Sequence, residues 1–198
     1  MLNHILIKPD HKEPLREVDR IKFSPDGLES NLSCNPLRQV LILPTKVLRE
    51  FNLQPGDLRE NLVIEHDELH DLPSGTALLI GSARLRLTFH CEPCKRIQDK
   101  VAISDIQHQR GYFGQFLNCG TLFQNDLVIN LGVVFEPIPY KLSDRLPWFL
   151  SQQERPVTIT EILYGCGLGS YYARAIPNMV KRLPPALREK VVLRKQAA

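Results

Sequence analysis

Residues 76–97 read TALLIGSARLRLTFHCEPCKRI, and this stretch decides the fold. It holds two apolar runs, 76–81 and 83–89, with Gly81-Ser82 between them, a pair that suits a tight hairpin turn. In the second run, leucine and phenylalanine alternate with arginine and threonine, which is the two-residue period of a strand with one face in solvent. The pattern therefore predicts two antiparallel strands joined by a short turn.

The rest of the N-terminal two thirds carries more short apolar runs, bounded by glycine, proline, asparagine or aspartate. Together they predict a mainly β fold, in which a mostly antiparallel sheet closes into a barrel. A short helix is expected at 46–51, with Thr45 as its cap. Further strands are expected at 40–43, 62–65 and 126–135.

Length and composition are those of an ordinary globular protein. The chain has 198 residues, of which 43% are hydrophobic and 24% charged, a composition that favours neither a disordered nor a fibrous class. No apolar run approaches the ~18 residues of a membrane span, and residues 1–14 lack the apolar core of a signal peptide. The five cysteines are odd in number and mostly isolated, which argues against a disulfide framework. We therefore expect a cytoplasmic protein with reduced thiols and no membrane partner.

The C-terminal residues differ from the rest in charge and in pattern. Residues 141–198 carry ten Lys and Arg against four Asp and Glu, a net charge of +6. Since the whole chain has a net charge of +3, residues 1–140 sum to −3. After Pro137-Ile138-Pro139 the pattern turns helical. We therefore expect a β domain at 1–138 and a basic helical extension at 139–198.

Part of this extension, 158–183, reads as a helix, a glycine-rich turn and a second helix. Thr158 or Thr160 can cap the first helix. The length is compatible with a helix-turn-helix whose cations meet DNA phosphates, the candidates being Arg174, Lys181 and Arg182. Helical hairpins of this kind are also common as packing appendages. Both interpretations remain open on the sequence.

The second strand of the hairpin ends in two cysteines, Cys91 and Cys94, next to a proline and two cations. A thiol at a strand end beside Lys95 and Arg96 would be exposed enough to react and biased toward the thiolate. The pattern thus predicts a nucleophilic or metal-ligating sulfur at Cys94, with Cys91 as a candidate resolving thiol. The alternative is a buried structural thiol.

The Cys91-x-x-Cys94 spacing could instead be half of a zinc site. Candidate partners are scattered along the chain: His90, His108 and Cys119. The sequence has no second cysteine pair with zinc-ligand spacing, which disfavours zinc.

Four segments in order resemble the MOSC domain, named for the carboxy-terminal domain of molybdenum-cofactor sulfurases. They are PGDLRENL (55–62), LPSGTALLIGSARLRLT (72–88), EPCKRI (92–97) and GYFGQFLNCGTLFQNDLVI (111–129). Each segment alone is weak, but their order and spacing are specific, and the resemblance covers about residues 20–136. It implies a β-rich barrel with one functional cysteine, which falls on Cys94 because it follows the proline. In the family this cysteine carries sulfur or ligates the molybdenum of a bound pterin cofactor.

The resemblance also implies residues that hold an anionic cofactor. Arg59 and Asn61 fall on the family's RxN or GENL loop, and Arg38 falls near an early basic position. Arginine offers a planar fork suited to phosphate. The alternative is that Arg59 and Asn61 belong to a turn after Pro55-Gly56-Asp57, and that Arg38 is an exposed strand residue.

The chain departs from the family pattern at two places. The early "GD.H" element reads DGLESNLS (26–33), and a later "GD.V" turn reads Asn125-Asp126-Leu127-Val128. The second change is harmless in a turn, because asparagine tolerates positive φ.

The sequence and the resemblance together predict a MOSC-type protein that binds a molybdenum-pterin cofactor or carries sulfur on Cys94. Whether it is an enzyme stays open, the candidate activities being molybdenum-dependent redox chemistry and sulfur transfer. The implied partner is a sulfur donor or a redox protein. The alternative is a non-enzymatic nucleic-acid-binding or scaffold protein that uses residues 141–198.

Overall fold

The computed structural model describes residues 1–32 and 35–193. It divides into two compact units, which we call unit 1 (Met1–Pro137) and unit 2 (Ile138–Ala198). Each unit has a hydrophobic core of its own. Within the described residues no helix is both long and apolar enough to cross a membrane.

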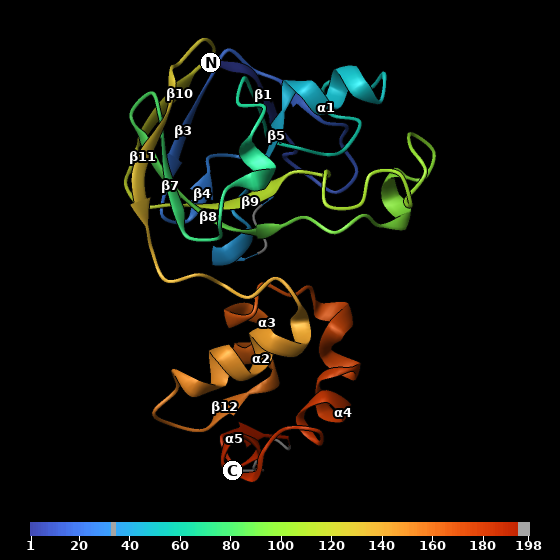
Figure 1. Cartoon of the computed structure of the whole chain (residues 1–198), viewed down its shortest axis with the longest axis vertical. Helices are drawn as coiled ribbons and strands as arrows, with labels where there is room; N and C mark the ends of the chain where they lie inside the picture. The colour runs from blue at the N-terminus through green and yellow to red at the C-terminus, as the bar shows by residue number, and fades with distance from the viewer. Residues whose placement is uncertain (33–34, 194–198) are drawn as a thin grey trace. The chain divides into compact units, whose positions relative to one another are not determined.

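Unit 1 is built from strands that curve around a common interior (Figure 1). They are β1 (Leu2–Ile7), β2 (Arg16–Glu17), β3 (Arg20–Ser24), β4 (Gly27–Leu28), β5 (Val40–Pro44), β6 (Leu62–Ile64), β7 (Thr76–Ile80), β8 (Ala83–His90), β9 (Tyr112–Phe116), β10 (Gly120–Phe123) and β11 (Val128–Val134). One sheet has the order β11-β7-β8-β9-β5-β6-β1-β2, and a second has the order β10-β3-β4. All pairs in unit 1 are antiparallel except β5 with β6. The predicted mainly β fold is confirmed.

The β7–β8 hairpin forms as the sequence predicts. Ile80 pairs with Ala83, and Gly81 in the turn has φ +54. Leu85 and Leu87 are fully buried inside the curved sheet, because every second side chain of β8 points inward. Thr88 departs from the predicted wet face. It is buried and donates its hydroxyl to the carbonyl of Leu37 at 2.7 Å, so the outer face of β8 is also covered near its end.

Unit 1 also has short helices: α1 (Thr45–Glu50) and the 3-10 helices η1 (Pro36–Arg38), η2 (Leu69–Asp71) and η3 (Lys95–Ile97). The predicted cap at Thr45 is wrong. Thr45 is the first residue of α1, and its hydroxyl donates to the carbonyl of Ile64 at 3.2 Å instead. Leu58 and Ile97, both fully buried, join α1 in a second apolar cluster. This cluster anchors the segment that follows Cys94.

Unit 2 is helical, with one small parallel strand pair. Its elements are α2 (Leu142–Ser151), β12 (Val157–Thr158), α3 (Ile159–Gly165), η4 (Ser170–Arg174), α4 (Ile176–Val180), α5 (Pro185–Arg188) and β13 (Val191–Val192). Thr158 caps α3 and forms a capping box with Glu161. The second predicted helix, within 158–183, is interrupted: a 3-10 turn comes first and the five-residue α4 follows.

Candidate functional site

Cys94 lies between β8 and η3, at the point where the chain leaves the sheet. Its backbone is extended, with φ −143 and ψ 165, and it occupies the position before the first residue of η3. The side chain is half-buried. The residue is therefore partly exposed to solvent, and the reactivity of its thiol stays a prediction.

Arg110 reaches the Cys94 sulfur from the residues just before β9. Its guanidinium Nη1 donates to Cys94 Sγ at 3.2 Å and to the carbonyl of Glu92 at 2.7 Å. The residue is only 6% exposed, and its buried Nε has no hydrogen-bond partner among the described residues. A guanidinium that donates to sulfur stabilises the thiolate form. Sequence reasoning missed Arg110, because nothing in QRGYF (109–113) marks this arginine as different from the others.

Two more arginines extend this positive group. Arg59, on the turn before β6, is half-buried. Burial lowers the pKa of the Arg59 guanidinium, the charges of Arg96 and Arg110 lower it further, and the Cys94 sulfur raises it. The Arg59 guanidinium is therefore within range of the charges of Arg96, Arg110 and Cys94. Cofactor contact of Arg59 stays a prediction, and Arg96, which the sequence places next to Cys94, lies in η3.

Arg38 is half-buried in η1. Its guanidinium carbon is 4.3 Å from the centre of the Phe113 ring. Burial raises the pKa of the Cys91 thiol, while the charges of Arg110 and Arg38 act in the opposite direction. Cys91 is 2% exposed, which is the environment of an inert thiol. Arg38 therefore packs on Phe113, and its charge acts on the Cys91 thiol.

Asn61 has a different role in this structure. Its amide oxygen accepts the backbone N–H of Leu41 at 3.0 Å, and its amide nitrogen donates to the carbonyl of Leu6 at 3.1 Å. A further bond joins the same nitrogen to the side chain of Asn31 at 3.3 Å. Asn61 thus ties β1 to β5, which fixes the end of the turn that carries Arg59. Contact of Asn61 with a cofactor stays a prediction.

A comparison with family models matches residues 29–128 to the MOSC domain. The chain belongs to the MOSC family. The match spans half of the chain and includes Arg38, Arg59, Asn61 and Cys94. The resemblance read from the sequence is therefore confirmed. No curated protein sequence matches the chain significantly.

Solved structures share the MOSC fold at low sequence identity. The YuaD protein from Bacillus subtilis is 15% identical, with a TM-score of 0.55, over 64% of this chain and 92% of that one. YiiM from Escherichia coli is 14% identical, with a TM-score of 0.54, over 96% of this chain and 98% of that one. YiiM from Geobacillus stearothermophilus is 15% identical, with a TM-score of 0.51, over 90% and 99%. At this identity the likeness concerns the fold alone.

The donor set around Cys94 suits the cofactor associated with MOSC domains. A thiolate is a soft metal ligand, and guanidiniums bind phosphate through paired N–H groups. The unsatisfied Nε of Arg110 is a further donor for a bound anion. In the described part of the chain no cluster of three or more His, Cys, Asp or Glu could hold a metal ion. A metal at this site would therefore depend on Cys94 and on the cofactor's own donors.

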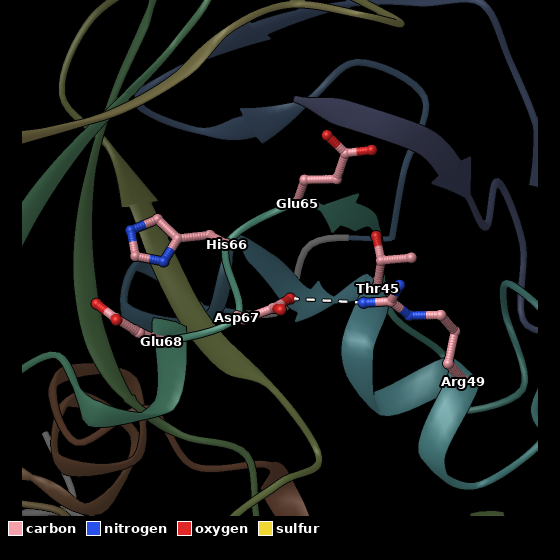
Figure 2. A pocket seen from close by; sticks show the side chains of 6 residues that line it. All are labelled: Thr45, Arg49, Glu65, His66, Asp67 and Glu68. Atoms are coloured by element: carbon pink, nitrogen blue, oxygen red, sulfur yellow. Dashed lines mark ion pairs between the residues drawn. The ribbon is translucent and has the colours of Figure 1, made fainter.

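Two pockets of the MOSC domain differ in chemistry from this site. The first, of about 480 Å³, is lined by residues of α1 and of the loop after β6 (Figure 2). Arg49 points across it toward Asp67, with the guanidinium 3.8 Å from the carboxylate. Glu65 and Glu68 add two more carboxylates. An acidic lining of this kind repels the anions that the arginines at Cys94 would attract.

The second pocket, of about 510 Å³, contains His70, His90 and His108. The backbone N–H of Gly111 donates to Nε2 of His70 at 3.2 Å, so this nitrogen carries no proton. Burial lowers the pKa of His70 to about 4. His70 is therefore a neutral acceptor near pH 7 and fixes the backbone directly after Arg110.

Proposed function

We propose that the MOSC domain of this protein binds an anionic molybdenum-pterin cofactor, with Cys94 as the protein ligand. The observation that carries this proposal is the 3.2 Å contact between the Arg110 guanidinium and Cys94 Sγ, beside Arg59 and Arg96. A thiolate within a group of guanidiniums suits a ligand that has both a soft metal and anionic groups.

The chain's own residues have separate tasks in this proposal. Cys94 holds the metal through sulfur. Arg110 donates a hydrogen bond to that sulfur, and Arg59 and Arg38 hold anionic groups of the cofactor. When bound, the cofactor would supply redox chemistry, while the polypeptide positions it and tunes its surroundings. The partner would then be a redox protein. The location would be the cytoplasm, where thiols such as that of Cys94 stay reduced.

The decisive experiment measures molybdenum in protein purified from cells that make the cofactor. We expect near-stoichiometric molybdenum in the unmodified protein and none in Cys94→Ala. Cys119→Ala is the matched control, because Cys119 is exposed and lies on the loop before β10. Arg110→Met should reduce the molybdenum content while leaving the fold intact. Equal molybdenum in the Cys94 and Cys119 variants would contradict the proposal.

A persulfide carrier is the second candidate, and the same contact favours it. A guanidinium that donates to Sγ would also stabilise the negative charge of a persulfide on Cys94. The partner would then be a sulfur donor. The expected sign is a mass increase of one sulfur on the peptide that contains Cys94, removed by dithiothreitol. Its absence after incubation with a persulfide donor would exclude this candidate.

A further inference from the structure

We propose that the apolar outer face of β11 is the interface through which two copies of this chain form a symmetric dimer. This face, which we call the β11 stripe, consists of every second residue of the strand and its flanks: Leu127, Ile129, Leu131, Val133 and Phe135. The inference goes beyond the proposed function and is independent of it, because it concerns self-association and needs no cofactor.

The β11 stripe lies on the outer face of the sheet. Val128, between the first two members of the stripe, packs against the core of unit 1 and pairs with the fully buried Ile80. Successive side chains of a strand point to opposite faces, so Ile129 points outward. Between Asn130 and Val134 the register shifts, and four residues of β11 pass two of β7. Two inserted residues keep the alternation in phase, so the stripe continues along one face.

The β11 stripe is exposed to solvent along its whole length. Its five residues are 40–65% exposed, and a Cβ placed on Gly132 would meet no atom within 4 Å. Residues 127–135 contain no charge, and Asn130 is their one polar side chain. Among the described residues β11 is an end strand of its sheet, hydrogen-bonded to β7 alone (Figure 1). Edge strands of soluble monomers are usually blunted by lysine or proline, so this strand has the features of an interface.

The size of the stripe fits a weak dimer. Five large apolar residues at this exposure present on the order of 450 Å² of surface. Two such faces packed against each other would remove about 900 Å² from solvent, close to the roughly 1,000 Å² at which specific interfaces begin. A dimer of this size should have a Kd of about 1–100 μM. Association should therefore depend on concentration in a range that is easily measured.

The ends of the stripe favour a two-fold, antiparallel pairing of the two copies. Asp126 directly precedes the stripe. At the other end the Arg86 guanidinium lies 5.7 Å from the centre of the Phe135 ring and donates to the carbonyl of Glu136. An antiparallel pair brings Arg86 of one copy toward Asp126 of the other, whereas a parallel pair would bring the two Asp126 carboxylates together. In the antiparallel pair Leu131, the middle of the stripe, faces its own counterpart.

The first test is sedimentation velocity of the full chain between about 1 and 300 μM, with dithiothreitol present. We expect the dimer fraction to rise with concentration. Leu131→Lys should weaken the dimer by about tenfold or more, because two ammonium groups would meet at the centre of the interface. Leu32→Lys is the matched control. Leu32 is 38% exposed against 40% for Leu131, and its N–H donates to the carbonyl of Lys8, just after β1.

Two results would overturn the proposal. One is a protein that stays monomeric over the whole concentration range, which would leave the stripe to a different partner or to none. The other is a dimer that Leu131→Lys and Leu32→Lys leave equally strong, which would place the interface elsewhere. Circular dichroism of both variants checks that they fold.

A second experiment tests the two-fold geometry and also serves if Leu131→Lys fails to fold. Cys34, Cys94 and Cys119 are replaced by alanine, which leaves the buried Cys91 and Cys166. In this background the wild-type stripe receives a single cysteine, and copper-phenanthroline is the oxidant.

Leu131→Cys should form a disulfide-linked dimer about tenfold faster than Leu127→Cys, because the middle of an antiparallel stripe alone meets its own copy. A mixture of Leu127→Cys and Phe135→Cys should link the two variants to each other. Non-reducing gel electrophoresis measures the rates. Equal rates for Leu131→Cys and Leu127→Cys would overturn the two-fold arrangement and with it the proposal.

Discussion

Each unit places a cysteine near a buried arginine, yet the two cysteines have opposite surroundings. In unit 1 the Arg110 guanidinium donates to the sulfur of the half-buried Cys94. In unit 2 the Cys166 thiol is fully buried and lies 3.8 Å from the carbonyl of Arg145, whose guanidinium donates to Tyr140 instead. Burial raises the pKa of Cys166 to about 12, although the Arg145 charge acts against it. A nearby arginine is thus insufficient. The guanidinium must reach a sulfur that solvent also reaches.

The largest expected difference is in chemical labelling of the two thiols. Cys166, with its pKa raised from 9.0 to about 12, has roughly a thousandfold less thiolate than an ordinary cysteine at neutral pH. Iodoacetamide at pH 8 should therefore label Cys94 in the folded protein within minutes and leave Cys166 unlabelled. Both should react in guanidinium chloride. Comparable labelling of Cys94 and Cys166 in the folded protein would contradict the difference in reactivity proposed for them.

The second largest expected difference between the two units is in how their stability depends on pH. All six histidines lie in unit 1. The pKa of His70 in the folded state, about 4, is below its unfolded value of 6.5. The unfolded chain therefore binds the proton more readily, and stability present above pH 6.5 is lost as the pH falls toward 4. Allowing for partial solvent screening, we expect unit 1 to lose about 2 kcal/mol.

Thermal melts followed between pH 7 and pH 4.5 check this expectation. His70→Gln keeps an acceptor for the Gly111 amide without a titratable ring, so it should flatten the pH dependence of unit 1. The transition of unit 2 serves as the reference. A variant that melts with the same pH dependence as the unmodified protein would show that His70 is not the responsible group.

Replacing Arg110 or Arg145 should have a smaller effect, and it tests how each arginine influences the thiol near it. Arg110→Met removes a charged hydrogen bond to sulfur, and should slow Cys94 alkylation at pH 7 by about tenfold. Arg145→Met removes the matching charge in unit 2 and should leave Cys166 unlabelled, because burial dominates there. Peptide-resolved alkylation rates measure both. If Arg145→Met exposed Cys166 to labelling, circular dichroism would have to show whether unit 2 still folds.

The smallest effect should come from the cap of α3, the helix that ends just before Cys166. Thr158→Ala removes one side of the capping box and should cost about 1 kcal/mol. Local opening of α3 should then raise the slow labelling of Cys166 about fivefold and leave that of Cys94 unchanged. Hydrogen exchange of the α3 amides provides an independent measure. No gain in exchange would mean that the packing of unit 2 alone holds this helix.

The sequence predicts the features that depend on neighbouring residues. The alternating leucines of β8, the turn at Gly81 and the thiol at a strand end all follow from short-range patterns, because the side-chain period and the turn geometry are local. Arg59 could be assigned from the family motif for the same reason. The left-handed φ of Arg59, by contrast, could not be predicted from the residue type, and only its place in the turn is consistent with it.

Arg110 could not be predicted, because its contact depends on tertiary structure. It lies sixteen residues after Cys94. The segment between them has no strand or helix periodicity, and its Ile97 and Ile106 are buried in one cluster. The hydrogen bonds of the Asn61 amide to β1 and β5 could not be predicted from the sequence for a similar reason. The order of strands, which the sequence does not show, determines its partners.

The conformation of Arg59 has a consequence for how variants of this protein would be selected. Glycine at this position would relieve the backbone and would be favoured by any selection for thermostability alone. The same exchange would discard the guanidinium. A library sorted first by resistance to heat and only later by uptake of an anion would thus lose the relevant clones at the first step.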